Sequence, residues 1–102
     1  MKILVIDDER SIRNLMQEIL EDEGHSVDVA EDGSKGVEMA DKEKYDVIFC
    51  DIKMPSLSGE EVLDTLREKG IETPVVMISG HGDIDTAVSC IKKGAFDFLS
   101  KP

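Results

Sequence analysis

The sequence has 102 residues, of which 40% are hydrophobic and 34% are charged. This length fits one compact domain, residues 1–102, and is too short for two ordinary hydrophobic cores. Acidic residues outnumber basic residues by 23 to 12, which gives a formal net charge of -11. Such a charge disfavours binding to nucleic acid or to anionic membranes through bulk electrostatics. The first apolar run, Ile3 to Ile6, is too short for a signal peptide or a membrane span, so we expect a cytoplasmic domain.

Short apolar runs alternate with longer amphipathic stretches along the chain. This alternation is typical of repeated strand–helix units around a parallel sheet. The predicted strands are Lys2–Ile6, Ser26–Ala30, Val47–Cys50, Pro74–Ile78 and Asp97–Leu99. Because crossovers between parallel strands are almost always right-handed, the pattern predicts a flavodoxin-like open α/β sheet with the strand order 2-1-3-4-5.

Four helices are expected between the strands, because apolar residues recur there at helical spacing. Their apolar faces comprise, in chain order, Ile12, Leu15, Met16, Ile19 and Leu20; Val37 and Ala40; Val62, Leu63 and Leu66; and Ile84, Ala87, Val88 and Ile91. Asp32 and Asp83 are placed to cap helices with side-chain oxygens. Gly24, Gly70 and Gly94 are placed to end helices in a left-handed conformation.

Residues able to carry chemistry collect where the predicted strands end. Asp7 and Asp8 end the first strand, Asp51 ends the third, Ser79 ends the fourth and Lys101 follows the fifth. The carboxyl ends of parallel strands meet at one edge of the sheet, where sites form. Three carboxylates at one edge repel each other unless a cation lies between them.

The oxygen ligands favour Mg²⁺, Mn²⁺ or Ca²⁺, and a small open site with few carboxylates suits Mg²⁺ best. The expected metal ligands are Asp7, Asp8 and Asp51, with the main-chain carbonyl of Lys53 as a further ligand. The alternative interpretation of Asp7 and Asp8 is a solvated strand end or a helix cap. Asp51 and Lys101 at the same edge favour the metal site.

Asp51 follows an apolar run, where a carboxylate is held rigidly and can attack a phosphorus centre. The Lys101 ammonium and the Ser79 hydroxyl are then candidates for contacting the phosphoryl oxygens, because phosphoryl transfer depends mostly on positioning and electrostatics. A surface lysine and a turn serine are the ordinary alternatives. His81, on the same edge, is either a solvated loop histidine or a residue that influences water access.

The segment from Ile52 to Gly59 is predicted to be a loop by its proline, serines and glycine. Gly59 is expected to relieve a strained backbone before the third helix. This loop follows Asp51 directly and therefore borders the predicted site.

These residues together resemble the receiver domains of bacterial two-component response regulators, over nearly all of the chain. The motifs that carry the resemblance are Asp7-Asp8-Glu9, Asp51-Ile52-Lys53-Met54-Pro55 with Gly59, Ser79, and Lys101-Pro102. The resemblance implies that Asp51 accepts a phosphoryl group from a sensor histidine kinase and that Asp7 and Asp8 organise Mg²⁺. It also implies that Ser79 and Lys101 contact the phosphoryl, and that Phe98 is the aromatic switch residue. Such a domain is a phosphoacceptor and not an enzyme.

Residues 78–98 are most similar to the receivers of nitrogen-regulation-type activators, which usually carry an ATPase domain and a DNA-binding domain. Neither output domain is expected within these 102 residues, and the family's fifth helix is expected to be missing after the last strand. One face of the sheet should then lose part of its cover, because both faces of a parallel sheet need covering. The exposed apolar surface predicts a homodimer or lower stability.

Two other functional classes use related architecture. A phosphohydrolase of the haloacid-dehalogenase type needs a second aspartate two residues after the nucleophile, and Lys53 occupies that position. A flavin-binding module needs a glycine- and hydroxyl-rich phosphate loop after the first strand, where this chain has Asp7-Asp8-Glu9. The sequence therefore favours neither alternative.

Overall fold

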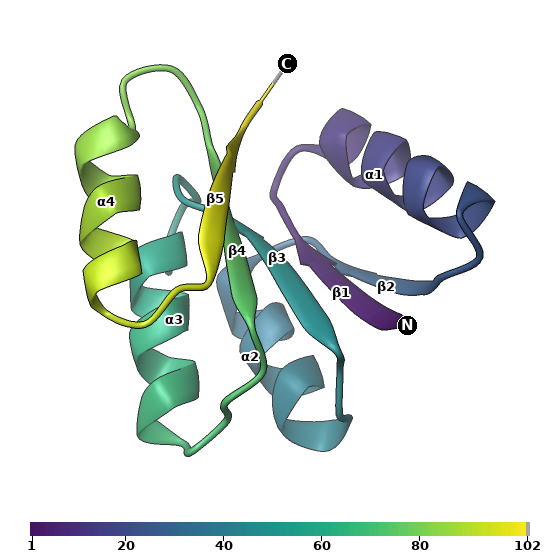
Figure 1. Ribbon diagram of the computed structural model, residues 1–102, viewed down its shortest axis with the longest axis horizontal. Coiled ribbons are helices and arrows are strands. Elements are labelled where there is room, and N and C mark those ends of the chain that lie inside the picture. Colours follow the sequence, from purple (N-terminus) through teal and green to yellow (C-terminus); the bar gives the residue numbers. More distant parts are fainter. Residues whose placement is uncertain (102) are drawn as a thin grey trace.

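The structure is a computed structural model that describes residues 1–101, in which strands and helices alternate (Figure 1). Pro102, the second residue of the Lys-Pro pair, lies outside the described residues. The elements are β1 (Lys2–Ile6), α1 (Arg10–Asp22), β2 (Ser26–Ala30), α2 (Gly33–Lys42), β3 (Val47–Asp51), α3 (Gly59–Glu68), β4 (Val75–Ser79), α4 (Ile84–Lys92) and β5 (Asp97–Ser100).

The five strands form one parallel sheet in the order β2-β1-β3-β4-β5, which confirms the predicted topology. Three strand ends extend one residue beyond the prediction, to Asp51, Ser79 and Ser100. The ladder explains this extension, because Asp51 pairs with Ile78 and Ser79 pairs with Ser100. Asp51 and Ser79 are therefore held by the sheet itself.

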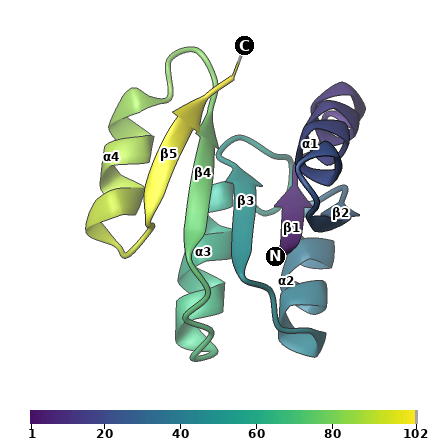
Figure 2. The same cartoon turned by 45° about the vertical axis from the view of Figure 1, so that its right-hand side comes forward.

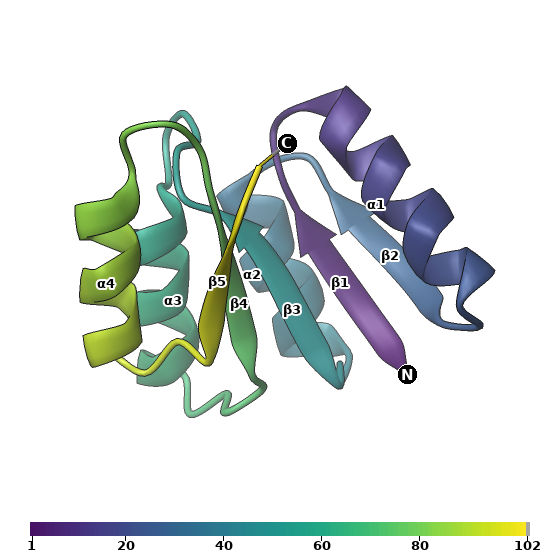
Figure 3. The same cartoon turned by 45° about the horizontal axis from the view of Figure 1, so that its top comes forward.

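The helices divide unequally between the two faces of the sheet. Helices α2, α3 and α4 cover one face, and α1 lies on the other (Figures 2 and 3). The larger core lies under the three helices and is built from residues such as Leu4, Ile48, Leu63 and Met77, all fully buried. The smaller core lies under α1 and contains Ile3, Val5 and Val27.

Helix ends follow the sequence signals in most places. The Asp32 carboxylate accepts a hydrogen bond from the Lys35 N–H at 2.8 Å and caps α2 as predicted. Gly24, Gly70 and Gly94 all have positive φ angles, which confirms their left-handed conformation. The predicted cap at Asp83 is wrong, because within the described part of the chain its side chain makes no capping hydrogen bond to α4.

The apolar face predicted for α4 is only partly buried. Ala87 and Cys90 are buried, whereas Ile84, Val88 and Ile91 are exposed. Small side chains therefore pack this helix against the sheet, and its larger side chains point away from the core.

An apolar groove of about 190 Å³ lies between α1 and β5 and is lined by Leu15, Ile19, Ile78 and Leu99, among others. On this face, no second helix of residues 1–101 joins α1. Phe96 is 72% exposed and Leu99 is 48% exposed, as predicted for the last strand and the residue before it. In contrast, all five residues of β4 are buried.

No helix within residues 1–101 is both long enough and apolar enough to cross a membrane.

Candidate functional site

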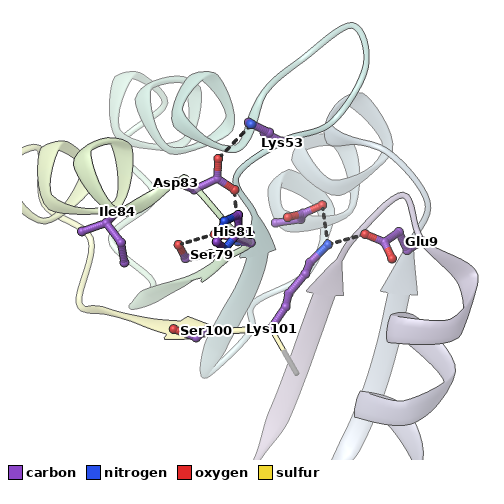
Figure 4. Close-up of a pocket in the computed structure, with 11 residues that line it drawn as sticks. Glu9, Lys53, Ser79, His81, Asp83, Ile84, Ser100 and Lys101 are labelled. Atoms are coloured by element: carbon purple, nitrogen blue, oxygen red, sulfur yellow. Dashed lines mark hydrogen bonds and ion pairs between the residues drawn. The ribbon is translucent and has the colours of Figure 1, made fainter.

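The structure brings the predicted site residues together at the carboxyl edge of the sheet. Several of them border a cleft of about 730 Å³ between the loops that follow β1, β3, β4 and β5 (Figure 4). The lining includes Glu9, Asp51, Lys53, Ser79, His81, Asp83 and Lys101. Residues from four separate parts of the chain therefore face one space.

A cluster of four carboxylates lies at this edge of the sheet, and two of them, Glu9 and Asp51, line the cleft. Asp7, Asp8, Glu9 and Asp51 each offer an oxygen atom, and these atoms lie within 4.8 Å of one another. Asp7 is fully buried and Asp51 is 2% exposed, whereas Asp8 and Glu9 are exposed. Asp7 Oδ1 accepts the Glu9 N–H at 2.8 Å, but its buried Oδ2 has no hydrogen-bond partner among the described residues.

The Lys101 ammonium lies inside this carboxylate cluster. Its Nζ is 2.6 Å from Glu9 Oε1, 3.2 Å from Asp51 Oδ2 and 3.6 Å from Asp7 Oδ2. Figure 4 shows the lysine reaching toward Glu9 across the cleft. The backbone of Lys101 is held by β4, because the Lys101 N–H donates to the Ser79 carbonyl at 2.8 Å. The Lys101 charge thus partly offsets three carboxylates.

Burial and repulsion from neighbouring carboxylates disfavour the charged forms of Asp7 and Asp51. Burial, followed by the Asp7 charge, raises the pKa of Asp51 from 3.8 to about 7, although Lys101 opposes this shift. Burial also raises the pKa of Asp7. Burial lowers the pKa of Lys101, but Glu9, Asp51 and Asp7 outweigh it, and the net pKa is raised. A divalent cation would offset the same repulsion more completely than one ammonium.

The residues present fit Mg²⁺. The unpartnered Asp7 Oδ2, the adjacent Asp51 carboxylate and the exposed Asp8 supply hard oxygen ligands on an open site, where the ion can keep waters. The Lys53 carbonyl stays a predicted ligand, two residues beyond Asp51. The Lys53 side chain lines the cleft and forms an ion pair with Asp83.

Ser79 and Phe98 occupy neighbouring strands beside the cleft. Ser79 is buried, and its hydroxyl donates a long hydrogen bond of 3.4 Å to the Gly80 carbonyl. Phe98 is half-buried against the larger core and pairs with Met77 across β4 and β5. His81 is exposed on the cleft wall. The Ser79 hydroxyl is thus weakly held and able to turn to another acceptor.

The loop between β3 and α3 shows why Gly59 occupies its position. The expected relief of backbone strain at Gly59 is wrong, because the positive φ of this loop, 69°, belongs to Ser56. Instead, a Cβ atom at Gly59 would lie 2.1 Å from the Asp51 carbonyl oxygen. Glycine allows the start of α3 to pack directly against the end of β3.

Two residues of the site were not identified from the sequence. Glu9 was part of the acidic motif but had no assigned role, although a third consecutive acid after a strand is a detectable signal. Asp83 is 4% exposed and faces Lys53 and the Gly80 N–H. No sequence signal distinguishes this position from an ordinary helix cap.

Comparisons with known proteins agree with this geometry. The family model described as "Response regulator receiver domain" matches residues 3–102. The nitrogen assimilation regulatory protein NtrX of Azorhizobium caulinodans is 46% identical over an alignment of 102 positions, which covers 98% of this chain and 22% of that protein. The chain thus spans about a fifth of the length of this curated relative.

Solved structures give the same result. The receiver domain of NtrX from Brucella abortus has a TM-score of 0.92 and 45% sequence identity, covering 98% of this chain and 85% of that chain. The response regulator TrrA of Thermotoga maritima, solved in complex with Mg²⁺ and BeF, has a TM-score of 0.87 and 32% identity. That match covers 99% of this chain and 86% of the TrrA chain.

Proposed function

Because the chain belongs to the response regulator receiver domain family, we propose that it is a phosphorylation switch of a two-component system with Asp51 as phosphoacceptor. Its family makes it a phosphoacceptor and not an enzyme that turns over a substrate, which sets the phosphohydrolase alternative aside. The observation that carries the proposal is the position of Asp51. It is buried at the end of β3, with an oxygen atom within 4.8 Å of oxygen atoms of Asp7, Asp8 and Glu9, and 3.2 Å from the Lys101 ammonium.

The chemistry is a phosphoryl transfer onto a carboxylate. One Asp51 oxygen forms a bond to phosphorus while the bond from phosphorus to the donor breaks, and the bonding electron pair leaves with the donor. With a sensor histidine kinase as donor, the leaving atom is an imidazole nitrogen. Mg²⁺ held by Asp7, Asp8, Asp51 and the Lys53 carbonyl would supply charge neutralisation for the phosphoryl oxygens.

Two residues of this chain complete the site. The Lys101 ammonium, 3.2 Å from Asp51 Oδ2, needs a small movement to contact the phosphoryl group. The Ser79 hydroxyl, weakly bonded to Gly80, turns toward the same group. Phe98 lies on β5, which pairs with the strand that ends at Ser79, so a change at Ser79 reaches Phe98 through the sheet.

The partners of the domain follow from this switch. A sensor histidine kinase supplies the phosphoryl group, a cytoplasmic location suits that donor, and the acidic surface disfavours direct binding to nucleic acid. Homodimerisation stays a prediction, supported by exposed Phe96 and Leu99. The relative named NtrX is a nitrogen assimilation regulator, and transcriptional output is the corresponding proposal for a protein that contains this domain.

Phosphorylation with acetyl phosphate and intact-mass measurement tests the proposal. We expect one added phosphoryl per chain, dependent on Mg²⁺ and released by hydroxylamine, with free acetate as the leaving group. Asp51→Asn should gain none, because the amide is nearly isosteric but a poor nucleophile. Stoichiometric phosphorylation of the Asp51→Asn variant would overturn the assignment.

A further inference from the structure

A second ion pair crosses the mouth of the cleft, separate from the Lys101 cluster. Lys53 Nζ lies 3.2 Å from Asp83 Oδ1. Lys53 belongs to the loop between β3 and α3, and Asp83 belongs to the loop between β4 and α4. Figure 4 shows the two side chains meeting above the cleft, beside Ser79 and His81. The pair therefore joins the loop that follows the phosphoacceptor to the loop that follows Ser79.

The two partners differ in exposure. The Asp83 side chain is 4% exposed, whereas the Lys53 side chain is 74% exposed. A buried carboxylate that loses its counter-ion is costly, because neither water nor another charge replaces the partner. An exposed lysine loses little when it moves to another anion. The lysine is thus the mobile partner and Asp83 is the one that depends on it.

Asp83 also fixes the turn next to Ser79. Its Oδ2 accepts the Gly80 N–H at 3.0 Å, and the Gly80 carbonyl in turn accepts the Ser79 hydroxyl at 3.4 Å. A chain of contacts therefore runs from Lys53 through Asp83 and Gly80 to Ser79. Asp83 occupies the N-cap position of α4, yet its side chain makes no capping bond within residues 1–101. Rotation of the carboxylate toward the first turn of α4 offers it a second set of donors.

A phosphoryl group on Asp51 would compete for the lysine. Asp51, Lys53, Ser79 and Asp83 line the same cleft. Phosphorylation places up to two negative charges and three strong acceptor oxygens there, and the exposed Lys53 side chain lines the same cleft. We propose that the Lys53–Asp83 ion pair is a positioning pair that couples the phosphoryl group to the loop between β4 and α4.

The coupling has two states. Without the phosphoryl group, Lys53 holds Asp83, Asp83 holds the Gly80 N–H, and the Ser79 hydroxyl stays on the Gly80 carbonyl. With the phosphoryl group, Lys53 turns to its oxygens, Asp83 releases Gly80, and the Ser79 hydroxyl is free to contact the phosphoryl group. This inference rests on the proposed function and adds a regulatory role for two residues outside its carboxylate and ammonium set.

Amide NMR of the Gly80 N–H reports directly on the pair. The variants are Lys53→Met, Asp83→Asn, their double variant and Lys53→Arg, each titrated with beryllofluoride in the presence of Mg²⁺. Without ligand, Lys53→Met should move the Gly80 resonance toward the position that the wild type reaches with beryllofluoride. Lys53→Arg should keep the wild-type position, because a guanidinium still pairs with Asp83. Circular dichroism melting checks that each variant is folded.

The affinity for beryllofluoride gives a second readout, in which the two single variants should change in opposite directions. Asp83→Asn should tighten binding, because Lys53 no longer has to leave a partner, and Lys53→Met should weaken it. Each change should be roughly two- to fivefold, the range expected for one partly exposed ion pair. The effect of Asp83→Asn should shrink when Lys53 is already methionine. The control is the ion pair of Lys69 and Asp41, 3.8 Å apart, which lies at the C-terminal ends of α3 and α2 and does not line the cleft. Lys69→Met and Asp41→Asn should change neither readout.

Two outcomes separate this inference from the proposed function. If the wild type binds no beryllofluoride and accepts no phosphoryl group, both are overturned. If the wild type binds beryllofluoride but the Gly80 resonance of free Lys53→Met stays at the wild-type position, the positioning pair alone is overturned.

Discussion

Two polar clusters lie at opposite edges of the same sheet, and they differ in how well their carboxylates are partnered. Near the amino ends of β1 and β3, the Tyr45 hydroxyl lies 2.7 Å from an Asp28 oxygen and 3.2 Å from a Glu43 oxygen, and these two carboxylates share its single proton. Lys2 Nζ lies 3.0 Å from Glu43, and the Lys2 N–H donates to Asp46 at 2.7 Å. We call this set, Lys2, Asp28, Glu43, Tyr45 and Asp46, the amino-edge cluster.

The carboxyl-edge cluster, Asp7, Asp8, Glu9, Asp51 and Lys101, is under-partnered by comparison. Lys101 serves three carboxylates, and among the described residues Asp7 Oδ2 has no hydrogen-bond partner. The pKa of Glu43 is lowered, first by its bond to Lys2, whereas the pKa of Asp51 is raised by burial. A satisfied polar cluster stabilises the fold, whereas an unsatisfied one marks a place where a ligand completes the bonding.

The largest expected effect concerns the pH dependence of stability without Mg²⁺. Asp51 has a pKa of about 7 in the folded chain against 3.8 as the ordinary value, so between these values the folded state holds a proton that the unfolded state has lost. The free energy of unfolding therefore falls as pH rises through this window. Asp51→Asn should remove the loss, which is on the order of 4 kcal/mol at 1.36 kcal/mol per pKa unit.

Chemical denaturation of the wild type and of Asp51→Asn at several pH values measures this difference. The matched variant at the amino edge is Glu43→Gln. Because the pKa of Glu43 is lowered and not raised, this variant should gain no stability relative to the wild type as pH rises. Parallel pH profiles for the wild type and Asp51→Asn would contradict the unfavourable burial of the Asp51 charge.

Mg²⁺ should reverse the penalty at the carboxyl edge. At about 100 times its dissociation constant, the ion should stabilise the wild type by about 2.7 kcal/mol. Asp8→Ala should abolish most of this gain, because Asp8 is a proposed ligand, whereas Asp46→Ala at the amino edge should preserve it. Thermal melting with and without Mg²⁺ decides the point, and equal melting shifts in the wild type and Asp8→Ala would contradict a metal role for Asp8.

The sequence predicted the contacts that depend on where strands end, but not the contacts that depend on the direction of side chains. Strand order and the meeting of Asp7, Asp51, Ser79 and Lys101 followed from apolar runs that end in polar residues. Contacts that depend on side-chain direction did not follow. The Lys53–Asp83 pair forms across two loops whose relative position is set by tertiary packing, and the exposure of Val88 and Ile91 depends on how α4 is turned against the sheet.

Tyr45→Phe tests whether the amino-edge cluster contributes stability independently of the carboxyl-edge cluster. It removes the hydroxyl that Asp28 and Glu43 share, so it should cost about 1.5 to 3 kcal/mol of unfolding free energy, as for other hydrogen bonds to charged groups. It should leave Mg²⁺ affinity and phosphorylation unchanged. A denaturant melt beside an acetyl phosphate assay tests both parts, and reduced phosphorylation of folded Tyr45→Phe would show that the two edges are not independent.

A smaller effect is expected for the relay within the carboxyl edge. Ser79→Ala and Lys101→Ala should impair signalling more than Mg²⁺ binding, because their proposed contacts are to the phosphoryl group. NMR of Phe98 with and without beryllofluoride measures the relay, and both variants should show a reduced shift. If both bind beryllofluoride and move Phe98 as the wild type does, the relay through Ser79 and Lys101 is wrong.

A titration of Mg²⁺ followed by amide NMR tests the central claim most directly, because both edges are observed in one sample. We predict saturable shifts at Asp7, Asp8 and at residues 51–53, with little change at Asp28, Glu43 and Asp46. The same titration of Asp51→Asn should need more Mg²⁺ to produce these shifts. Equal shifts at the two edges, or saturation centred on the amino-edge cluster, would contradict the claim that the under-partnered carboxylates form the metal and phosphoryl site.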